Sequence, residues 1–114
     1  MASAYGGAHS VSGSPVVVAQ TSIHVGSGGR VMAIGTSVVT GANSAAVCQL
    51  FLGTTPGRTI GYAGVGGNVR YASLTTSASW FDLSTGTYDV KFQCHEATGT
   101  TVSVSQNYVM AWGG

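Results

Sequence analysis

The sequence predicts an all-β fold, an antiparallel β-sandwich of about eight strands. Apolar residues recur at every second position in several runs, which is the spacing of a strand with one buried face. Turn segments rich in glycine separate these runs at short intervals, and no stretch has the 3.6-residue period of an amphipathic helix. Short strands joined in this way are typical of sandwiches and barrels.

The turns delimit each expected strand. The runs are residues 16–25, 30–40, 45–52, 59–65, 69–74, 79–83, 87–96 and 101–112. The sequence Gly66-Gly67-Asn68 is typical of a hairpin turn between two of these strands. In the last run, alternate residues from Val102 to Trp112 are apolar apart from Gln106, so we expect them to share one face.

The chain of 114 residues fits one domain. Residues 1–14 are mostly small and show little patterning, so they are expected to form a flexible N-terminal arm. Such an arm is either disordered or ordered by a partner. Residues 15–114 are expected to form the sandwich domain, with Pro15 at the start of its first strand.

Charged residues are scarce, at 6% of the chain, against about 25% in ordinary domains. Four dispersed cations cannot form the basic stripe that nucleic-acid binding needs. No apolar run approaches the roughly 20 residues of a membrane span. We therefore expect neither nucleic acid nor membrane as a partner. A net charge of +1 gives little repulsion between copies, which favours association with other proteins.

Two cysteines, Cys48 and Cys94, lie on the apolar sides of their strands. The first residues lack the basic and apolar regions of a secretory signal, so synthesis in a cytoplasm is expected. In that compartment the cysteines are expected to be buried thiols. A disulfide across strands or sheets is the alternative. Zinc would need two more ligands and only His95 is near, so no metal or cofactor is expected.

No catalytic constellation stands out, and we expect no enzyme. Adjacent Cys94 and His95 point to opposite faces of a strand, so they cannot act as nucleophile and base. A pair of Cys48 and His95 remains geometrically open. The only carboxylates lie at or near turns, where a local hydrogen bond or a surface ion pair is expected: Asp82, Asp89 and Glu96.

Aromatic side chains are the candidate binding residues. Trp80 and Phe81 are adjacent and face opposite sides of a strand, so one of them is expected outside the core. An outward aromatic is typical of a protein interface, and the alternatives are core packing or a platform for sugar. The interface candidates are Tyr5, Trp80, Phe81, Tyr108 and Trp112.

Four segments also share a pattern with a known family. They are Gly28 to Thr36, Val47 to Gly53, Leu83 to Gln93 and Val102 to Ser105. With their turns, they make residues 16–112 resemble the small TNF-like jelly-roll domains of tailed-phage virion proteins, such as head-decoration proteins and fibre knobs. The resemblance implies a jelly roll, no enzyme activity, and homotrimers in which aromatic strand faces pack around a three-fold axis. Cys48 and Cys94 are not part of the pattern.

The resulting hypothesis is a bacteriophage virion structural protein. It would be a homotrimeric decoration protein on the outer capsid surface, with the major capsid protein or another virion protein as its partner. The N-terminal arm would clamp a neighbour. One alternative is a tail-tip or fibre receptor-binding knob that contacts glycan through loops 53–58 and 64–68. A carbohydrate-binding module is the other.

Overall fold

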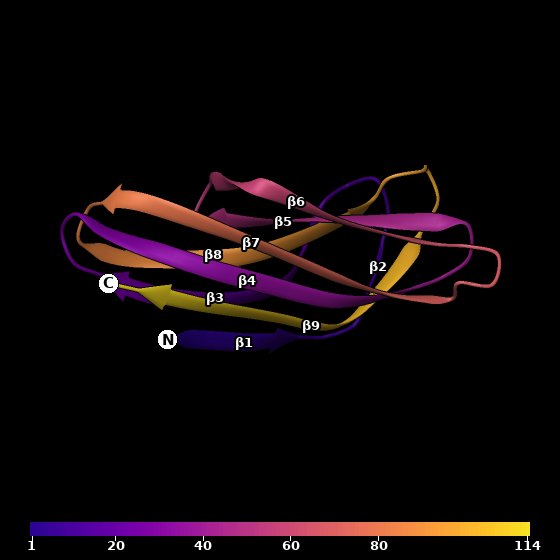
Figure 1. Cartoon of the computed structure of the whole chain (residues 1–114), viewed down its shortest axis with the longest axis horizontal. Coiled ribbons are helices and arrows are strands. Elements are labelled where there is room, and N and C mark those ends of the chain that lie inside the picture. The colour runs from indigo at the N-terminus through magenta and orange to yellow at the C-terminus, as the bar shows by residue number, and fades with distance from the viewer.

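The computed structural model describes all 114 residues, and they form two β-sheets packed face to face (Figure 1). The nine strands are β1 (Ala2–Gly6), β2 (His9–Val11), β3 (Val16–Val25), β4 (Gly29–Thr40), β5 (Ser44–Leu52), β6 (Thr55–Val65), β7 (Tyr71–Leu83), β8 (Gly86–Glu96) and β9 (Val102–Gly113). All strand pairings are antiparallel, which confirms the predicted all-β sandwich. No helix is present that could cross a membrane.

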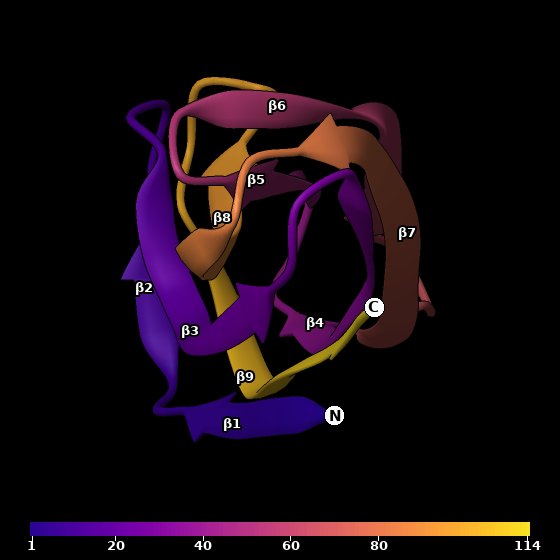
Figure 2. The ribbon, with the colours of Figure 1, turned by 90° about the vertical axis from the view of Figure 1, so that its left-hand side faces the viewer.

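Strands that are distant in sequence lie side by side, as in a jelly roll. Sheet A has the order β1-β9-β4-β7, and β2 also pairs with β9. Sheet B has the order β3-β8-β5-β6. The end view shows the two layers, with the chain crossing between them at the loops (Figure 2). The molecule is elongated, with extents of 49 × 20 × 17 Å.

The inward faces of the two sheets form one apolar core. Its largest fully buried side chains are Phe92, Leu50 and Leu74, surrounded mainly by valines. Gly35 of β4 lies opposite Phe92 of β8, and a Cβ at Gly35 would come within 2.5 Å of the Phe92 ring. A glycine is therefore needed there for the sheets to approach closely across the core.

The N-terminal segment differs from the predicted flexible arm. Its strands β1 and β2 both pair with β9, and Val11 is buried in the core. A Cβ at Gly6 would lie only 1.5 Å from the carbonyl oxygen of Val18, so β1 passes against β3 without space for a side chain. The small residues of this segment reflect close packing instead of flexibility. The domain therefore includes residues 2–6 and 9–11.

Two further expectations about strands are corrected. Runs 69–74 and 79–83 are parts of one strand, β7, because the intervening segment continues the alternation with Thr76 and Ala78 facing inward. The chain does turn where the hairpin was predicted, with a bridge between Gly66 and Val69. However, β6 belongs to sheet B and β7 to sheet A, so the turn crosses between the layers.

Strand β9 contains an irregularity that reverses which residues face outward. Gln106 has a φ of 49°, and the register with β4 shifts between Thr36 and Val38. Val102 and Val104 before the bulge are buried, but after it the alternate set faces inward. The prediction that Val102 to Trp112 share one face is thus wrong beyond Gln106. The residues turned outward are Tyr108, Met110 and Trp112.

Asn107 holds this bulge in place. Its side chain is fully buried and accepts a hydrogen bond of 2.7 Å from the Ser37 hydroxyl. Its amide nitrogen donates to the carbonyls of Gly7, at 2.9 Å, and Val104, at 3.3 Å. One buried amide therefore joins the bulge to β4 and to the N-terminal segment.

Cys48 and Cys94 form a disulfide, so the expectation of buried thiols is wrong. They are direct partners in the register of β5 and β8, with Cα atoms 4.1 Å apart, and both are fully buried. This register places the two sulfurs together, as the cross-strand alternative requires. The bond links the two central strands of sheet B covalently.

Candidate interaction surface

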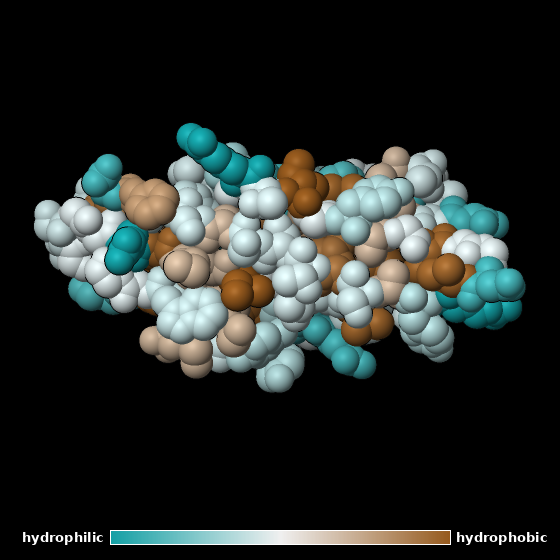
Figure 3. Space-filling view, viewed as in Figure 1, coloured by the Kyte–Doolittle hydropathy of each residue, from teal (hydrophilic) through white to brown (hydrophobic).

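The outward side of sheet A, here called face A, consists of apolar and hydroxyl side chains. Its charged groups, Arg30 and Asp82, lie at one end of the sheet, near the ends of β4 and β7. Figure 3 views this face, which is brown and pale over its middle, with most of the teal residues at the ends and rim. The large apolar side chains on it are Tyr5, Met32, Ile34, Val38, Tyr71, Phe81, Tyr108, Met110 and Trp112.

The register of β1, β9 and β4 arranges these side chains in rows. Tyr5 lies opposite Tyr108, with ring centroids 4.3 Å apart and planes tilted by 38°. The next rows place Met110 opposite Ile34, and Trp112 opposite Met32. Because Tyr5 is 80% exposed, most of the surface of its ring is available to a partner.

A hollow of about 460 Å³ lies at the charged end of face A. Met32, Trp112 and Phe81 line it, together with Arg30 and the C-terminal glycines. Three large apolar side chains around a hollow are the arrangement in which an interface takes up a partner's anchor residue.

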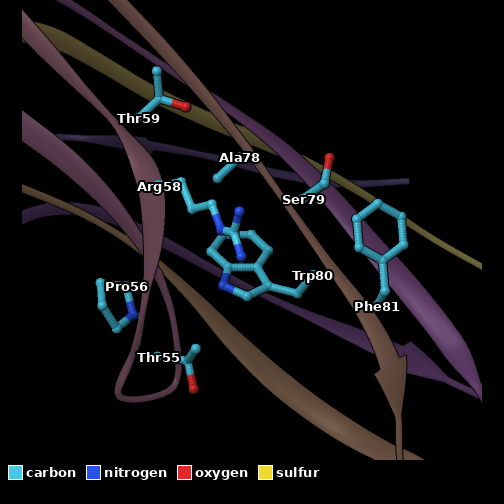
Figure 4. Close-up of a pocket in the computed structure, with 8 residues that line it drawn as sticks. All are labelled: Thr55, Pro56, Arg58, Thr59, Ala78, Ser79, Trp80 and Phe81. Atoms are coloured by element: carbon cyan, nitrogen blue, oxygen red, sulfur yellow. The ribbon is translucent and has the colours of Figure 1, made fainter.

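A second hollow is a groove of about 580 Å³ between β6 and β7, at the edge where the two sheets meet (Figure 4). Its lining residues are Thr55, Pro56, Arg58, Thr59, Ala78, Ser79, Trp80 and Phe81. Ser79 and Phe81 also line the hollow on face A, so Phe81 forms the ridge between the two.

The two adjacent aromatics of β7 face opposite ways, as the sequence predicts. Phe81 is 63% exposed and points outward, whereas Trp80 is only 7% exposed and packs in the core beside the groove. The prediction that Trp80 is an outward interface residue is therefore wrong. Tyr5, Phe81, Tyr108 and Trp112 all reach face A. Met32, Ile34 and Met110 were missed, since only the sheet register reveals that they face outward.

The outward side of sheet B, here called face B, is mixed. Its strands β5 and β6 carry apolar side chains, among them Phe51, Ile60 and Tyr62, of which Ile60 is 58% and Tyr62 is 65% exposed. Face B is also charged along its middle. It carries Asp89, Lys91 and His95 of β8 and several amide and hydroxyl side chains. Asp89 accepts a hydrogen bond of 2.9 Å from Ser22, and His24 lies 3.3 Å from the Thr87 hydroxyl. These cross-strand polar contacts are those of a solvated sheet face.

Glu96 is a structural carboxylate. It is 2% exposed and accepts hydrogen bonds from the amides of Ala45, Thr98 and Thr100 and from the Thr98 hydroxyl. Burial alone would raise its pKa, but these hydrogen bonds outweigh burial and lower the pKa from 4.5 to about 2. Glu96 thus joins the end of β8 to the start of β5. The sequence indicated only that it lies near a turn.

The remaining ionisable groups are dispersed. No group of three or more His, Cys, Asp or Glu residues is placed so that it could hold a metal ion. The pairing of Cys48 with His95 does not occur, because the Cys48 sulfur is bonded to Cys94. His95 lies opposite Val47 in the register and is half-buried on face B.

The sequence matches no family model, and it matches no curated protein. Among solved structures, the chain is similar to Eiger TNF from S. frugiperda, with a TM-score of 0.54 and 14% identity over 98% of this chain and 88% of that one. The chain is less similar to the C-terminal CBM6 of LamC, a marine laminarinase from Zobellia galactanivorans, with a TM-score of 0.39 and 16% identity. That likeness covers 95% of this chain and 90% of the other. The likeness to Eiger TNF concerns the fold alone, and this chain is a TNF-like jelly roll.

Proposed function

We propose that this chain is a non-catalytic structural subunit that assembles into a homotrimer through face A. The observation that supports this most strongly is the difference in charge between the middles of the two outward faces. Face A gathers Tyr, Trp, Phe and Met side chains and has no charged residue along its middle, whereas face B carries Asp89 and Lys91 there. Aromatics and methionine are enriched in interface cores and charged residues are depleted there. An apolar area of this kind is otherwise unfavourable in water.

Three copies are proposed because of the TNF-like fold and the resemblance of residues 16–112. In a ring of three, face A of one copy contacts an edge of the next copy and face B stays outside the contact, so the ring closes on itself. The elongated shape suits packing with the long axes side by side, since each contact then runs along the 49 Å dimension.

The proposed setting is a tailed-phage virion, with the trimer seated on the outer capsid surface and bound to the major capsid protein or another virion protein. The resemblance and the low charge of the chain support this setting. Strands β1 and β2 belong to sheet A, so contact with a capsid is assigned to other surfaces, such as the loops at the ends of the sandwich. Neither nucleic acid, membrane nor cofactor is part of the proposal.

Glycan recognition is the second candidate, as a tail-tip or fibre knob or as a carbohydrate-binding module. A specific observation favours it. The segment 53–58 was expected to be a loop that contacts glycan; it is strand β6 from Thr55 onward, and it contributes Thr55, Pro56 and Arg58 to the groove between β6 and β7.

A matched pair of substitutions tests the assembly. Met110 on face A and Gln93 on face B are both half-buried outward residues on long strands. We expect Met110→Lys to yield folded single chains, because it places a charge in the contact. Gln93→Lys should leave the trimer intact. The measurement is mass in solution by light scattering, and trimers for both variants would contradict the use of face A. Co-sedimentation of the Gln93→Lys trimer with empty capsids separates decoration from the knob function.

A further inference from the structure

We propose that the groove between β6 and β7 binds an acidic saccharide, meaning a sugar ring that carries a carboxylate. Arg58 and Phe81 would be the main contact residues. This deepens the second candidate function, and it requires that Phe81, at the rim of face A, stays accessible from the groove when copies assemble. The groove volume, about 580 Å³, lies within the roughly 300–1,000 Å³ of small-molecule sites.

The first argument is charge. Arg58 extends over the groove in Figure 4, and no carboxylate lines it. Arg30 lines the adjoining hollow on the other side of Phe81, which adds positive potential. Asp82 follows Phe81 in the chain but lines neither hollow. A guanidinium without an acidic neighbour can bind a carboxylate by two parallel charge-assisted hydrogen bonds.

The second argument is an unpartnered buried donor. The indole Nε1–H of Trp80 has no acceptor, although its residue is 93% buried and lines the groove. Buried polar atoms nearly always have a partner. The indole nitrogen lies on the side of Trp80 toward Pro56 in Figure 4, and Pro56 is another residue of the groove lining.

The third argument is the remaining lining. Phe81 offers an exposed aromatic ring at the rim, on which the apolar face of a sugar can stack. Thr55, Thr59 and Ser79 contribute hydroxyl groups that both donate and accept hydrogen bonds. One aromatic ring, several hydroxyls and a guanidinium match a hydroxylated, anionic ring better than an apolar peptide.

The test is calorimetric titration of the full chain with a short oligogalacturonide and, separately, with its methyl ester. The acid should bind, and the ester should bind at least about tenfold more weakly because it lacks the charge. Added salt should weaken the binding of the acid. Equal binding of acid and ester, or binding of neither, would overturn the proposal.

Matched arginine variants localise the site. Arg58→Gln should weaken binding by about tenfold or more. Arg70→Gln removes the same charge near the opposite end of β7 and should leave affinity unchanged. Phe81→Ser should weaken binding of the acid with little change in folding, since Phe81 is exposed. Equal affinities for the two arginine variants would contradict the assignment.

The Met110→Lys variant separates this proposal from the assembly. If the groove alone holds the sugar, the dissociated variant should bind the oligogalacturonide as well as the unaltered chain does. Loss of binding in that variant would instead place the ligand between copies and overturn a site built within one chain.

Discussion

The two outward faces of the sandwich differ in charge, whereas the two inward faces are alike in being apolar. Both sheets contribute alternating apolar residues to one core. Outside, face B carries Asp89, Lys91 and His95 beside exposed apolar residues such as Ile60 and Tyr62, whereas the middle of face A has only apolar and hydroxyl side chains. Core packing cannot account for this difference, because the outward residues do not contribute to the core. Exposed apolar surface indicates contact with a partner.

One irregular residue produces much of the contrast. Before Gln106, β9 buries its valines in the usual alternation, and after it the aromatics face outward. Without the extra residue, Tyr108 and Trp112 would point into the core. Asn107 fixes the bulge through three hydrogen bonds. The binding surface and the core therefore depend on the same local structure.

The largest expected effect is a loss of stability on removal of the disulfide in sheet B, without loss of assembly through face A. Replacing both Cys48 and Cys94 by Ala should lower the free energy of unfolding by about 2–4 kcal/mol, since the bond closes a loop of 46 residues in the unfolded chain. Denaturant unfolding measures this. Because the disulfide lies within sheet B, the folded variant should still assemble. A variant that folds but stays monomeric would mean that the faces are not independent.

Acid should act on the end of sheet B and not on face A. The pKa of Glu96 is lowered from 4.5 to about 2 in the folded chain. Its contribution to stability is therefore present above pH 4.5 and is lost as pH falls toward 2. Thermal unfolding across this range should show the decline, and Glu96→Gln should flatten it while lowering stability at neutral pH. An unchanged slope in the variant would assign the acid sensitivity to other groups.

The smallest expected effect concerns the edge of face A. Tyr5→Ser removes the ring that packs on Tyr108 and should cost the single chain about 0.5–1.5 kcal/mol. Measured in the Met110→Lys background, this change reports intrachain packing alone. In the unaltered background, the same change should also weaken assembly, because Tyr5 is exposed to a partner. Equal effects in the two backgrounds would place Tyr5 outside the contact.

Much of the fold could be predicted, because strand alternation and glycine turns are local signals. The segment from Val16 to Leu52 illustrates this, since its three strands were expected within a residue of their ends. The N-terminal strands could not be predicted, because their small residues give no alternation of apolar and polar positions. A small residue is needed there because Gly6 lies against the backbone of Val18, and this contact cannot be seen in the sequence. The bulge at Gln106 could not be predicted either. Its only signal in the sequence is a single glutamine in a run of alternating apolar residues.

The candidate surface was predicted in part. Tyr5, Phe81, Tyr108 and Trp112 lie on face A, and Trp80 does not. Adjacent residues in a strand always face opposite ways, but the sequence does not say which one is outward. The disulfide could not be predicted with certainty from the sequence, because it requires the register of β5 against β8, and these strands are far apart in the chain.

The most direct test of self-assembly is the mass of the unaltered chain in solution, measured by sedimentation over a wide range of concentrations. The account predicts a species of three times the 11.4 kDa chain mass. That mass should persist at high salt, because the contact is apolar instead of ionic. A mass of one chain at the highest concentration would contradict the assignment of face A as a contact between copies.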